Sequence, residues 1–331
     1  MKQQTLPGID QPVSQLVFGC WGIASDFHWG SRDEQESTAA IHAALDAGIN
    51  FFDTAEVYGD GASETLLGKA LAGERQRVVL ASKVHPKSMR AAEVIEACER
   101  SLARLGADYL DLFQTHWTDR EIGIAESWEA MIRLQEQGKV RAIGVCNAGV
   151  GDMAAASTLQ TPASNQLPYN LVWRAIEAEI LPDCREREVG VLAYSPLMHG
   201  LLAGNYAAAD DVPDGRARSR HFNTQRELAR HGEAGCEAAT FNAINAIREI
   251  CNRLGRTMAD VALAWVAAQP GVTCVIAGVK NAEQLAANVR SLANPLATEV
   301  CQELAAATDD LAAALGPNCD MWQGAATSRY R

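Results

Sequence analysis

The chain has 331 residues, of which 48% are hydrophobic and 21% charged, an ordinary globular composition with ample material for a core. Its formal net charge of −12 argues against binding to nucleic acid or to an anionic membrane surface, because an acidic surface repels phosphate groups. The longest apolar stretch, 261–279, is interrupted by Gln269, Pro270 and Gly271. It is therefore predicted to be a helix followed by a strand, and not a membrane span.

The nine cysteines include no CxxC pair and no Cys/His spacing typical of metal ligands. They are predicted to be reduced thiols, and we expect no bound metal. The first residues, Met1 to Gln4, lack the apolar core of a signal peptide. Together these features favour a cytoplasmic protein, whereas no feature of the sequence predicts an oligomeric state.

Short β-branched runs alternate with longer helical patterns along the chain. Strands are predicted at 16–18, 49–52, 78–82, 110–115, 140–145, 162–165, 189–193 and 273–276. The clearest helices, at 38–47, 93–105 and 125–137, are each followed by a glycine that can end a helix. Eight strand-helix units in a chain of this length favour an α/β fold of the closed (β/α)8 TIM-barrel type over an open sheet.

We expect a single domain that spans residues 1–331. It would carry a long loop at about 205–235 and a C-terminal tail at about 313–331. The segment 210–235 follows the seventh predicted strand and is rich in Arg, Asp, Gly and His. Long loops of this kind often cover a functional site.

Polar side chains stand at the carboxyl ends of successive predicted strands. They are Asp53, Lys83, His116, Asn147, Gln166 and Tyr194. Active sites of TIM barrels assemble at this face, and Tyr58 lies in the loop just after Asp53. Each residue alone has a structural explanation, such as a helix cap for Asp53 or a core hydrogen bond for His116. Their shared position at one face favours a catalytic site.

The chemistry of these groups suits protonation of a carbonyl oxygen. A tyrosine has a pKa of about 10, and the charge of Lys83 would lower the pKa of Tyr58. Asp53 would hold Lys83 in place, and a neutral His116 could donate a hydrogen bond to the developing oxyanion. No Ser–His or Cys–His pair is evident, so the attacking species is predicted to be a hydride from a cofactor.

Four long stretches carry a family resemblance. They are INFFDTAEVYG at 49–59, SETLLGKAL at 63–71, SLARLGADYLDL at 101–112 and GKVRAIGV at 138–145. With them the chain resembles the aldo-keto reductase family over nearly its whole length. The resemblance implies a (β/α)8 barrel, NAD(P)H as cofactor and a catalytic tetrad. That tetrad would be Asp53, Tyr58, Lys83 and His116, the same residues that the strand ends select.

The resemblance also implies which residues hold the nicotinamide half of the cofactor. Cys146, Asn147 and Gln166 match the positions that bind its carboxamide, and Tyr194 matches the aromatic residue that stacks on the ring. Most relatives have serine in place of Cys146, and a thiol is the weaker hydrogen-bond partner. The residues that resemble the pyrophosphate loop are Ser195, Pro196, Leu197 and Gly200.

Phosphate recognition is expected at two further places. Asn205 stands where relatives often have lysine, so Arg218 or Arg220 is predicted to supply that charge. Gly278, Lys280, Gln284 and Asn288 resemble the adenosine-phosphate end of the site. A helix N-terminus beside Lys280 would attract a phosphate. We therefore favour NADPH, oxidised to NADP+, with NADH as the alternative.

A second glycine pattern, Gly149-Val150-Gly151, fits the loose dinucleotide fingerprint between a strand and a helix. The fingerprint also needs an acidic residue near the end of the next strand, and 166–174 contains none. We therefore interpret this segment as a turn.

The predicted function is the reduction of an aldehyde or ketone to an alcohol, in a reversible reaction with Tyr58 as the proton donor. One alternative is a Schiff-base aldolase that uses Lys83. Another is a non-catalytic, NADPH-sensing subunit of the kind that accompanies membrane channels.

Substrate choice is assigned to the mouth loops at 21–32 and 117–121 and to the tail at 318–331. Trp21, Trp29 and Trp117 are the candidate substrate contacts. Aromatic residues mixed with aspartates suit a sugar aldehyde or another polar carbonyl.

Overall fold

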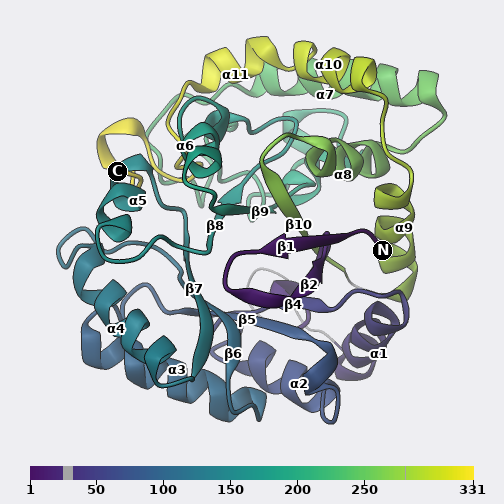
Figure 1. Ribbon diagram of the computed structural model, residues 1–331. Helices are drawn as coiled ribbons and strands as arrows, with labels where there is room; N and C mark the ends of the chain where they lie inside the picture. The colour runs from purple at the N-terminus through teal and green to yellow at the C-terminus, as the bar shows by residue number, and fades with distance from the viewer. Residues whose placement is uncertain (25–32, 280) are drawn as a thin grey trace.

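Eight parallel strands close into a barrel in the computed structural model, which describes residues 1–24, 33–279 and 281–331 (Figure 1). Around the barrel, with β10 pairing with β3, these strands are β3 (Leu16–Gly19), β4 (Phe51–Asp53), β5 (Val79–Val84), β6 (Leu110–Thr115), β7 (Val140–Cys146), β8 (Ser164–Pro168), β9 (Gly190–Tyr194) and β10 (Val272–Gly278). All eight predicted strands are present, so the TIM-barrel prediction is confirmed.

Side chains alternate along each strand between the barrel interior and the surrounding helices. Phe51 on β4 and Ala81 on β5 pack in the apolar interior of the barrel. Two residues further along the same strands stand Asp53 and Lys83. The alternation therefore points both polar groups into the barrel at its carboxyl end.

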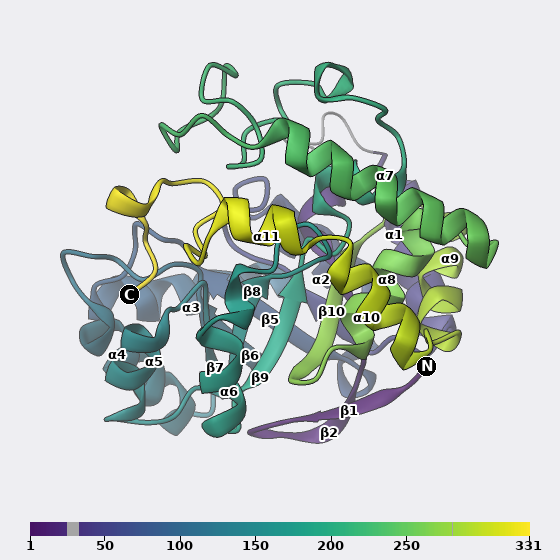
Figure 2. The ribbon, with the colours of Figure 1, turned by 90° about the horizontal axis from the view of Figure 1, so that it is seen from above.

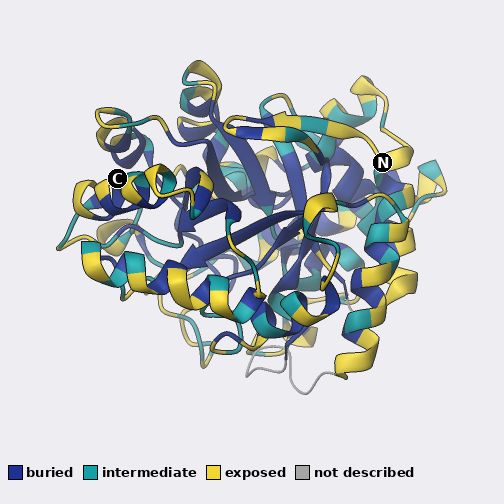
Figure 3. Ribbon diagram, turned by 60° about the horizontal axis from the view of Figure 1, so that its bottom comes forward, coloured by how far each residue is buried: buried dark blue, intermediate teal, exposed yellow. Residues whose placement is uncertain are grey.

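Helices form the outer layer and turn their buried faces toward the barrel (Figure 3). They are α1 (Glu34–Asp46), α2 (Ala62–Ala70), α3 (Ala91–Leu105), α4 (Ile124–Glu136), α5 (Val150–Ser157), α6 (Ile180–Glu186), α7 (Glu237–Leu254), α8 (Met258–Ala268), α9 (Ala282–Ala293), α10 (Thr298–Ala306) and α11 (Asp309–Leu315). Helix α3 ends at Gly106 with φ of 61°, the left-handed conformation expected of a glycine C-cap. In the described ranges, no helix has both the length and the apolar character needed to cross a membrane.

An antiparallel hairpin that the sequence did not predict closes the amino-terminal end of the barrel. It consists of β1 (Gln3–Leu6) and β2 (Ile9–Ser14), joined at Gly8 with φ of 76°. Leu6, Ile9 and Val13 pack against the apolar barrel interior. Figure 2 shows the hairpin at one end of the barrel and α7 with its preceding loops at the other. The hairpin therefore covers the end of the barrel opposite to the strand ends that carry Asp53 and Lys83.

The long loop after β9 packs against the C-terminal tail. Between η4 (Met198–Ala203) and α7 its regular structure is limited to the short turn η5 (Ala209–Asp211). The tail follows α11 and contains only η6 (Ala325–Thr327). The backbone N–H of Arg220 in the loop donates to the carbonyl of Met321 in the tail at 2.9 Å. Loop and tail therefore form one cover beside the barrel mouth.

Candidate active site

Two neighbouring strand ends place a buried ion pair at the mouth of the barrel. Nζ of Lys83 donates to Oδ2 of Asp53 at 2.7 Å, and the two side chains are 0% and 3% exposed. A buried charge persists only where a partner and hydrogen bonds compensate its lost hydration. The pair therefore fixes a positive charge inside the mouth.

The loop after β4 brings Tyr58 to this charge. Nζ of Lys83 donates to Oη of Tyr58 at 3.2 Å and to the carbonyl of Thr54 at 2.8 Å. Together with the bond to Asp53, these contacts use all three donors of the ammonium group. The His116 ring lies edge-on to Tyr58, with ring centroids 5.8 Å apart. The structure thus brings together the four residues predicted as a tetrad.

Burial and charge together set the protonation states of these groups. Burial raises the pKa of Tyr58 to about 12, although the charge of Lys83 acts in the opposite direction. Burial alone would lower the pKa of Lys83, but Asp53 and Tyr58 raise it above its usual value. Burial and then Lys83 hold the pKa of His116 well below its usual 6.5. At neutral pH the site contains a phenol, an ammonium and a neutral imidazole.

The pKa of Tyr58 is raised, whereas Lys83 alone would lower it. The sequence-based prediction gave the effect of Lys83 on this pKa in the right direction. It did not account for desolvation of the phenol, which outweighs the ion.

Two glutamine amides complete the surroundings of Asp53. Nε2 of Gln166 donates to Oδ1 of Asp53 at 2.8 Å, and Nε2 of Gln114 approaches the same oxygen at 3.5 Å. Oγ of Ser164 in turn donates to Oε1 of Gln114 at 3.3 Å. Gln114 was missed by the sequence analysis. It stands two residues before His116, so the inward alternation of β6 was the pattern that could have found it.

A cavity of about 1100 Å³ opens above the tetrad and extends to α9. Ligand pockets usually hold roughly 300–1,000 Å³, so this one can take a large cofactor. The predicted site residues in its lining are Asp53, Tyr58, His116, Asn147, Gln166, Tyr194, Ser195, Pro196, Leu197, Gly200, Arg218, Gly278, Gln284, Asn288, Trp21 and Trp117. Further lining residues that were not predicted as contacts include Val57, Arg216, Leu228, Arg230 and Ala259.

Asn147 lies at the centre of the predicted nicotinamide end. Its Oδ1 accepts from Oη of Tyr194 at 2.8 Å and from Oη of Tyr330 at 2.9 Å. Its Nδ2 donates to the carbonyl of His116 at 3.1 Å. Asn147 has φ of 56°, a left-handed conformation in which asparagine is enriched. Cys146, the neighbouring prediction, is buried and is not part of the cavity lining.

The predicted pyrophosphate loop follows β9 in a contorted backbone. Ser195 and Gly200 have φ of 54° and 96°. A Cβ at Gly200 would come within 3.1 Å of Nη1 of Arg216. Glycine thus allows the loop and this guanidinium to approach each other at the cavity wall.

Of the two arginines predicted to meet the cofactor, the structure places Arg218 in the cavity lining and Arg220 outside it. Nε of Arg220 pairs with Glu233 at 2.7 Å, and its Nη atoms donate to the carbonyls of Leu315 and Asn318. Arg220 therefore ties the long loop to the tail. Arg218 therefore stays the predicted source of this charge, and Arg220 does not.

The adenosine end of the predicted site lies at α9. The side chain of Asn281 caps this helix by accepting from the backbone N–H of Gln284 at 3.0 Å. Gln284 and Asn288 lie one turn apart and both line the cavity. Lys280, the predicted phosphate contact, lies outside the described residues.

Aromatic side chains form the outer wall of the mouth. Trp21 stacks on Tyr58 with centroids 6.0 Å apart and an interplanar angle of 24°. The guanidinium of Arg329 lies 3.4 Å from the ring centre of Trp117. The third predicted substrate contact, Trp29, lies outside the described residues. The tail contributes Trp322, Gln323 and Arg329 to the lining of the same cavity, and its role in substrate choice stays a prediction.

The Gly149-Val150-Gly151 segment contacts the end of the chain itself. The backbone carbonyl of Arg331 accepts from the N–H of Gly151 at 2.8 Å. A Cβ at Gly149 would lie 1.9 Å from the same oxygen. The glycine pattern is explained by this close approach. The interpretation as a turn is wrong, because Gly149 is the N-cap of α5 and Val150 and Gly151 are its first residues.

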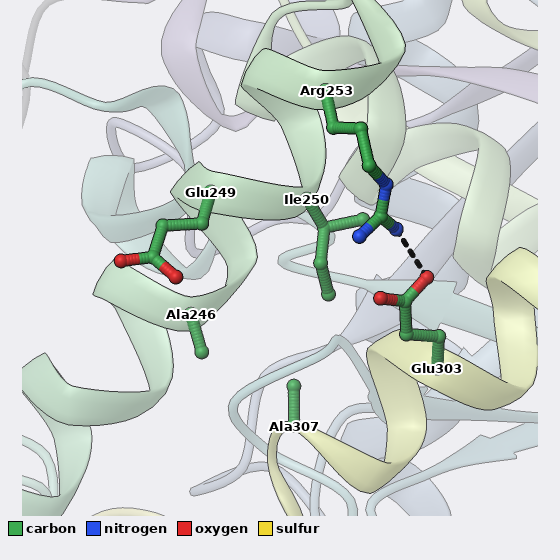
Figure 4. Close-up of a pocket in the computed structure, with 6 residues that line it drawn as sticks. All are labelled: Ala246, Glu249, Ile250, Arg253, Glu303 and Ala307. Atoms are coloured by element: carbon green, nitrogen blue, oxygen red, sulfur yellow. Dashed lines mark hydrogen bonds and ion pairs between the residues drawn. The ribbon is translucent and has the colours of Figure 1, made fainter.

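A smaller cavity of about 420 Å³ lies between α7 and α10 in the outer layer (Figure 4). One ion pair, Arg253 with Glu303, spans it. The other lining residues are Ala246, Glu249, Ile250 and Ala307. This set offers no nucleophile or imidazole, so the barrel mouth remains the candidate active site.

The family can now be assigned by comparison with known proteins. The sequence profile of the Aldo/keto reductase family matches residues 15–309, which include every tetrad residue. The chain belongs to the aldo/keto reductase family. This aldo-keto reductase is 33% identical over 291 residues to the aldo-keto reductase YhdN of Bacillus subtilis (strain 168), with 83% of this chain and 84% of that protein covered.

Solved structures agree with the assignment. A glycerol dehydrogenase from Gluconobacter oxydans superposes on this aldo-keto reductase with a TM-score of 0.80 at 30% identity, covering 96% of each chain. An aldo-keto reductase from Klebsiella pneumoniae, solved in complex with NADPH, gives a TM-score of 0.71 at 32% identity, covering 92% of this chain and 94% of that one.

Proposed function

We propose that this aldo-keto reductase uses NADPH to reduce an aldehyde or ketone to an alcohol, in a reversible reaction with Tyr58 as the proton donor. One observation carries the proposal. Lys83 donates its hydrogen bond to Oη of Tyr58, so the hydroxyl proton of Tyr58 is not used in that contact. Tyr58 also lines the cavity, so this proton is available to a substrate oxygen.

The tetrad supplies the proton chemistry. When bound, the reduced nicotinamide supplies a hydride to the carbonyl carbon. Tyr58 gives its proton to the oxygen, and the resulting phenolate is stabilised by the ammonium of Lys83 at 3.2 Å. Asp53 keeps that ammonium charged and in place. A neutral His116 can donate a hydrogen bond to the same oxygen without adding a second charge.

The hydrogen-bonding capacity of two amides fits a nicotinamide carboxamide. Gln166 uses Nε2 on Asp53, which leaves its Oε1 as an acceptor. Asn147 uses one Nδ2 hydrogen on the carbonyl of His116, which leaves the other as a donor. One acceptor and one donor match the two ends of a carboxamide. Tyr194 lines the same part of the cavity and would stack on the ring.

The cavity also fits phosphate groups. Arg216 lines it beside Gly200 and Arg218 lines it beside Trp322, and guanidinium groups bind phosphate oxygens in a forked geometry. Gln284 and Asn288 would hold the adenosine end beside the N-terminus of α9. The NADPH held by the Klebsiella pneumoniae relative supports the phosphorylated cofactor over NADH.

The proposed substrate is a sugar aldehyde or another polar carbonyl. Trp21, Trp117 and Trp322 offer flat apolar faces at the mouth, and Gln323 and Arg329 offer hydrogen-bond donors among them. The glycerol dehydrogenase relative, named for a polyol, supports the same substrate class.

The aldolase alternative is disfavoured by the state of Lys83. Schiff-base formation needs a neutral amine with a free lone pair. The neighbours of Lys83 raise its pKa, and all three donors of its ammonium are engaged. Lys83 is therefore placed as a fixed cation.

A substrate panel tests the proposal. Purified protein would be assayed with aldehydes, ketones and sugars by the loss of NADPH absorbance, with NADH in parallel. We expect turnover of polar aldehydes and a preference for NADPH. Tight NADPH binding without reduction of any carbonyl would contradict the enzymatic proposal, and borohydride trapping of a substrate on Lys83 would favour the aldolase.

A further inference from the structure

The last residues of the chain run along the active-site mouth and end beside α5. Figures 1 and 2 both show the C-terminus next to this helix. The carbonyl of Arg331 accepts from the N–H of Gly151 at 2.8 Å, and Nη2 of Arg331 donates to the carbonyl of Arg120 at 2.8 Å. These contacts join the end of the tail to the loop after β6 and to the first turn of α5.

A second anchor lies two residues earlier. Nε and Nη2 of Arg329 bind the two carboxylate oxygens of Asp320 at 2.7 and 2.8 Å, and the Asp320 side chain is fully buried. The backbone N–H of Arg329 also donates to Asp320 at 3.0 Å. Bidentate pairs of this kind have a defined geometry. Tyr330 is therefore held from both sides by fixed neighbours.

Tyr330 contacts the amide that we assign to the nicotinamide carboxamide. Its Oη donates to Oδ1 of Asn147 at 2.9 Å, and its ring lies edge-on to Trp117 with centroids 5.8 Å apart. Burial raises the pKa of Tyr330 well above its usual value, so the hydroxyl stays protonated and acts as a donor.

The hydrogen bonds of Asn147 determine the orientation of its amide. An amide oxygen accepts two hydrogen bonds, and the hydroxyls of Tyr194 and Tyr330 provide both. On the other side, Nδ2 donates to the carbonyl of His116. If the amide were turned over, its oxygen would face that carbonyl and its NH2 would face two hydroxyl donors. The two tyrosines thus fix the orientation of the Asn147 amide, in which one Nδ2 hydrogen is left for a further acceptor.

We propose that Tyr330 is a positioning residue for the cofactor: it holds the Asn147 amide so that the remaining Nδ2 hydrogen is available to the nicotinamide carboxamide. The inference rests on the proposed role of Asn147 in cofactor binding. Tyr330 acts through Asn147. The tail thereby contributes to cofactor binding as well as to the substrate wall.

The test is a double-mutant cycle on NADPH affinity, measured by titration calorimetry. Removing one hydrogen bond should raise the Kd for NADPH of Tyr330→Phe about threefold to tenfold. Asn147→Ala should raise it at least as much. In the Asn147→Ala background, adding Tyr330→Phe should change the Kd by less than about twofold, because a residue that acts through Asn147 has lost its partner. Tyr109→Phe, outside the cavity lining, is the matched control.

A fragment separates positioning from general damage. Adenosine 2′,5′-bisphosphate lacks the nicotinamide, so its affinity should be the same in Tyr330→Phe and the unmodified protein. Equal weakening of fragment and NADPH would show a merely structural tail and overturn the inference. Weaker NADPH binding in Asn147→Ala but not in Tyr330→Phe would overturn the inference alone. Unchanged NADPH binding in Asn147→Ala would overturn both it and the proposed role of Asn147.

Discussion

Replacement of Lys83 by methionine removes the only cation that contacts Tyr58 among the described residues, at nearly constant side-chain length. At 3.2 Å and an effective dielectric constant of about 20, the attraction between the ammonium and a phenolate is about 5 kcal/mol. A loss of that size would slow proton transfer by at most about 10⁴-fold. General acid catalysis is typically worth about 10²–10⁴-fold, so we expect turnover to fall by about 10³-fold.

The assay is single-turnover reduction followed by NADPH absorbance, together with the Kd for NADPH. Binding should change less than about threefold, because Lys83 is not part of the cavity lining. Since Lys83→Met leaves the buried Asp53 unpaired, the double variant Asp53→Asn/Lys83→Met serves as a folded comparison. The exposed Lys69→Met is the control. A Lys83→Met protein that melts normally and keeps more than about a tenth of its turnover would refute the role assigned to Lys83.

Two further predictions concern pH and stability. Reduction needs protonated Tyr58, whose pKa is raised to about 12, so kcat/KM for reduction should not fall through deprotonation of Tyr58 up to about pH 10. Alcohol oxidation needs the phenolate, so its kcat/KM should rise about tenfold per pH unit over the same range. A pKa near 8 in the reduction profile that Tyr58→Phe abolishes would contradict this. Arg104→Met removes the partner of the fully buried Glu64 and should lower the free energy of unfolding in urea by about 3–5 kcal/mol. Arg100→Met, with a 45% exposed side chain, should lower it by no more than about 1 kcal/mol, and equal losses would refute the distinction.

The barrel and the tetrad could be predicted because both follow from local patterns. Parallel strands end at one face, and period-two alternation decides which of their side chains enter the barrel. Asp53, Lys83 and His116 therefore converge from strands that are 30 or more residues apart in the chain. The same reasoning, continued along β6, would have included Gln114.

Other features depend on contacts that no local pattern encodes. The apolar residues of the hairpin at Gly8 pack against the barrel interior, and that surface exists only in the folded barrel. The sequence alone could not decide between Arg218 and Arg220 as the cofactor contact. The packed tail decides it, because Arg220 donates to the carbonyls of Leu315 and Asn318. Tyr330 is more than 180 residues from its partner Asn147, so the sequence offered no reason to pair them.

In the proposed mechanism Tyr58 donates the proton while other residues hold the cofactor. Tyr58→Phe removes only the hydroxyl and tests this most directly. Single-turnover reduction should slow by about 10²–10⁴-fold, while the Kd for NADPH stays within about twofold of that of the unmodified protein. A Tyr58→Phe protein that reduces the carbonyl at an unchanged rate would contradict the account.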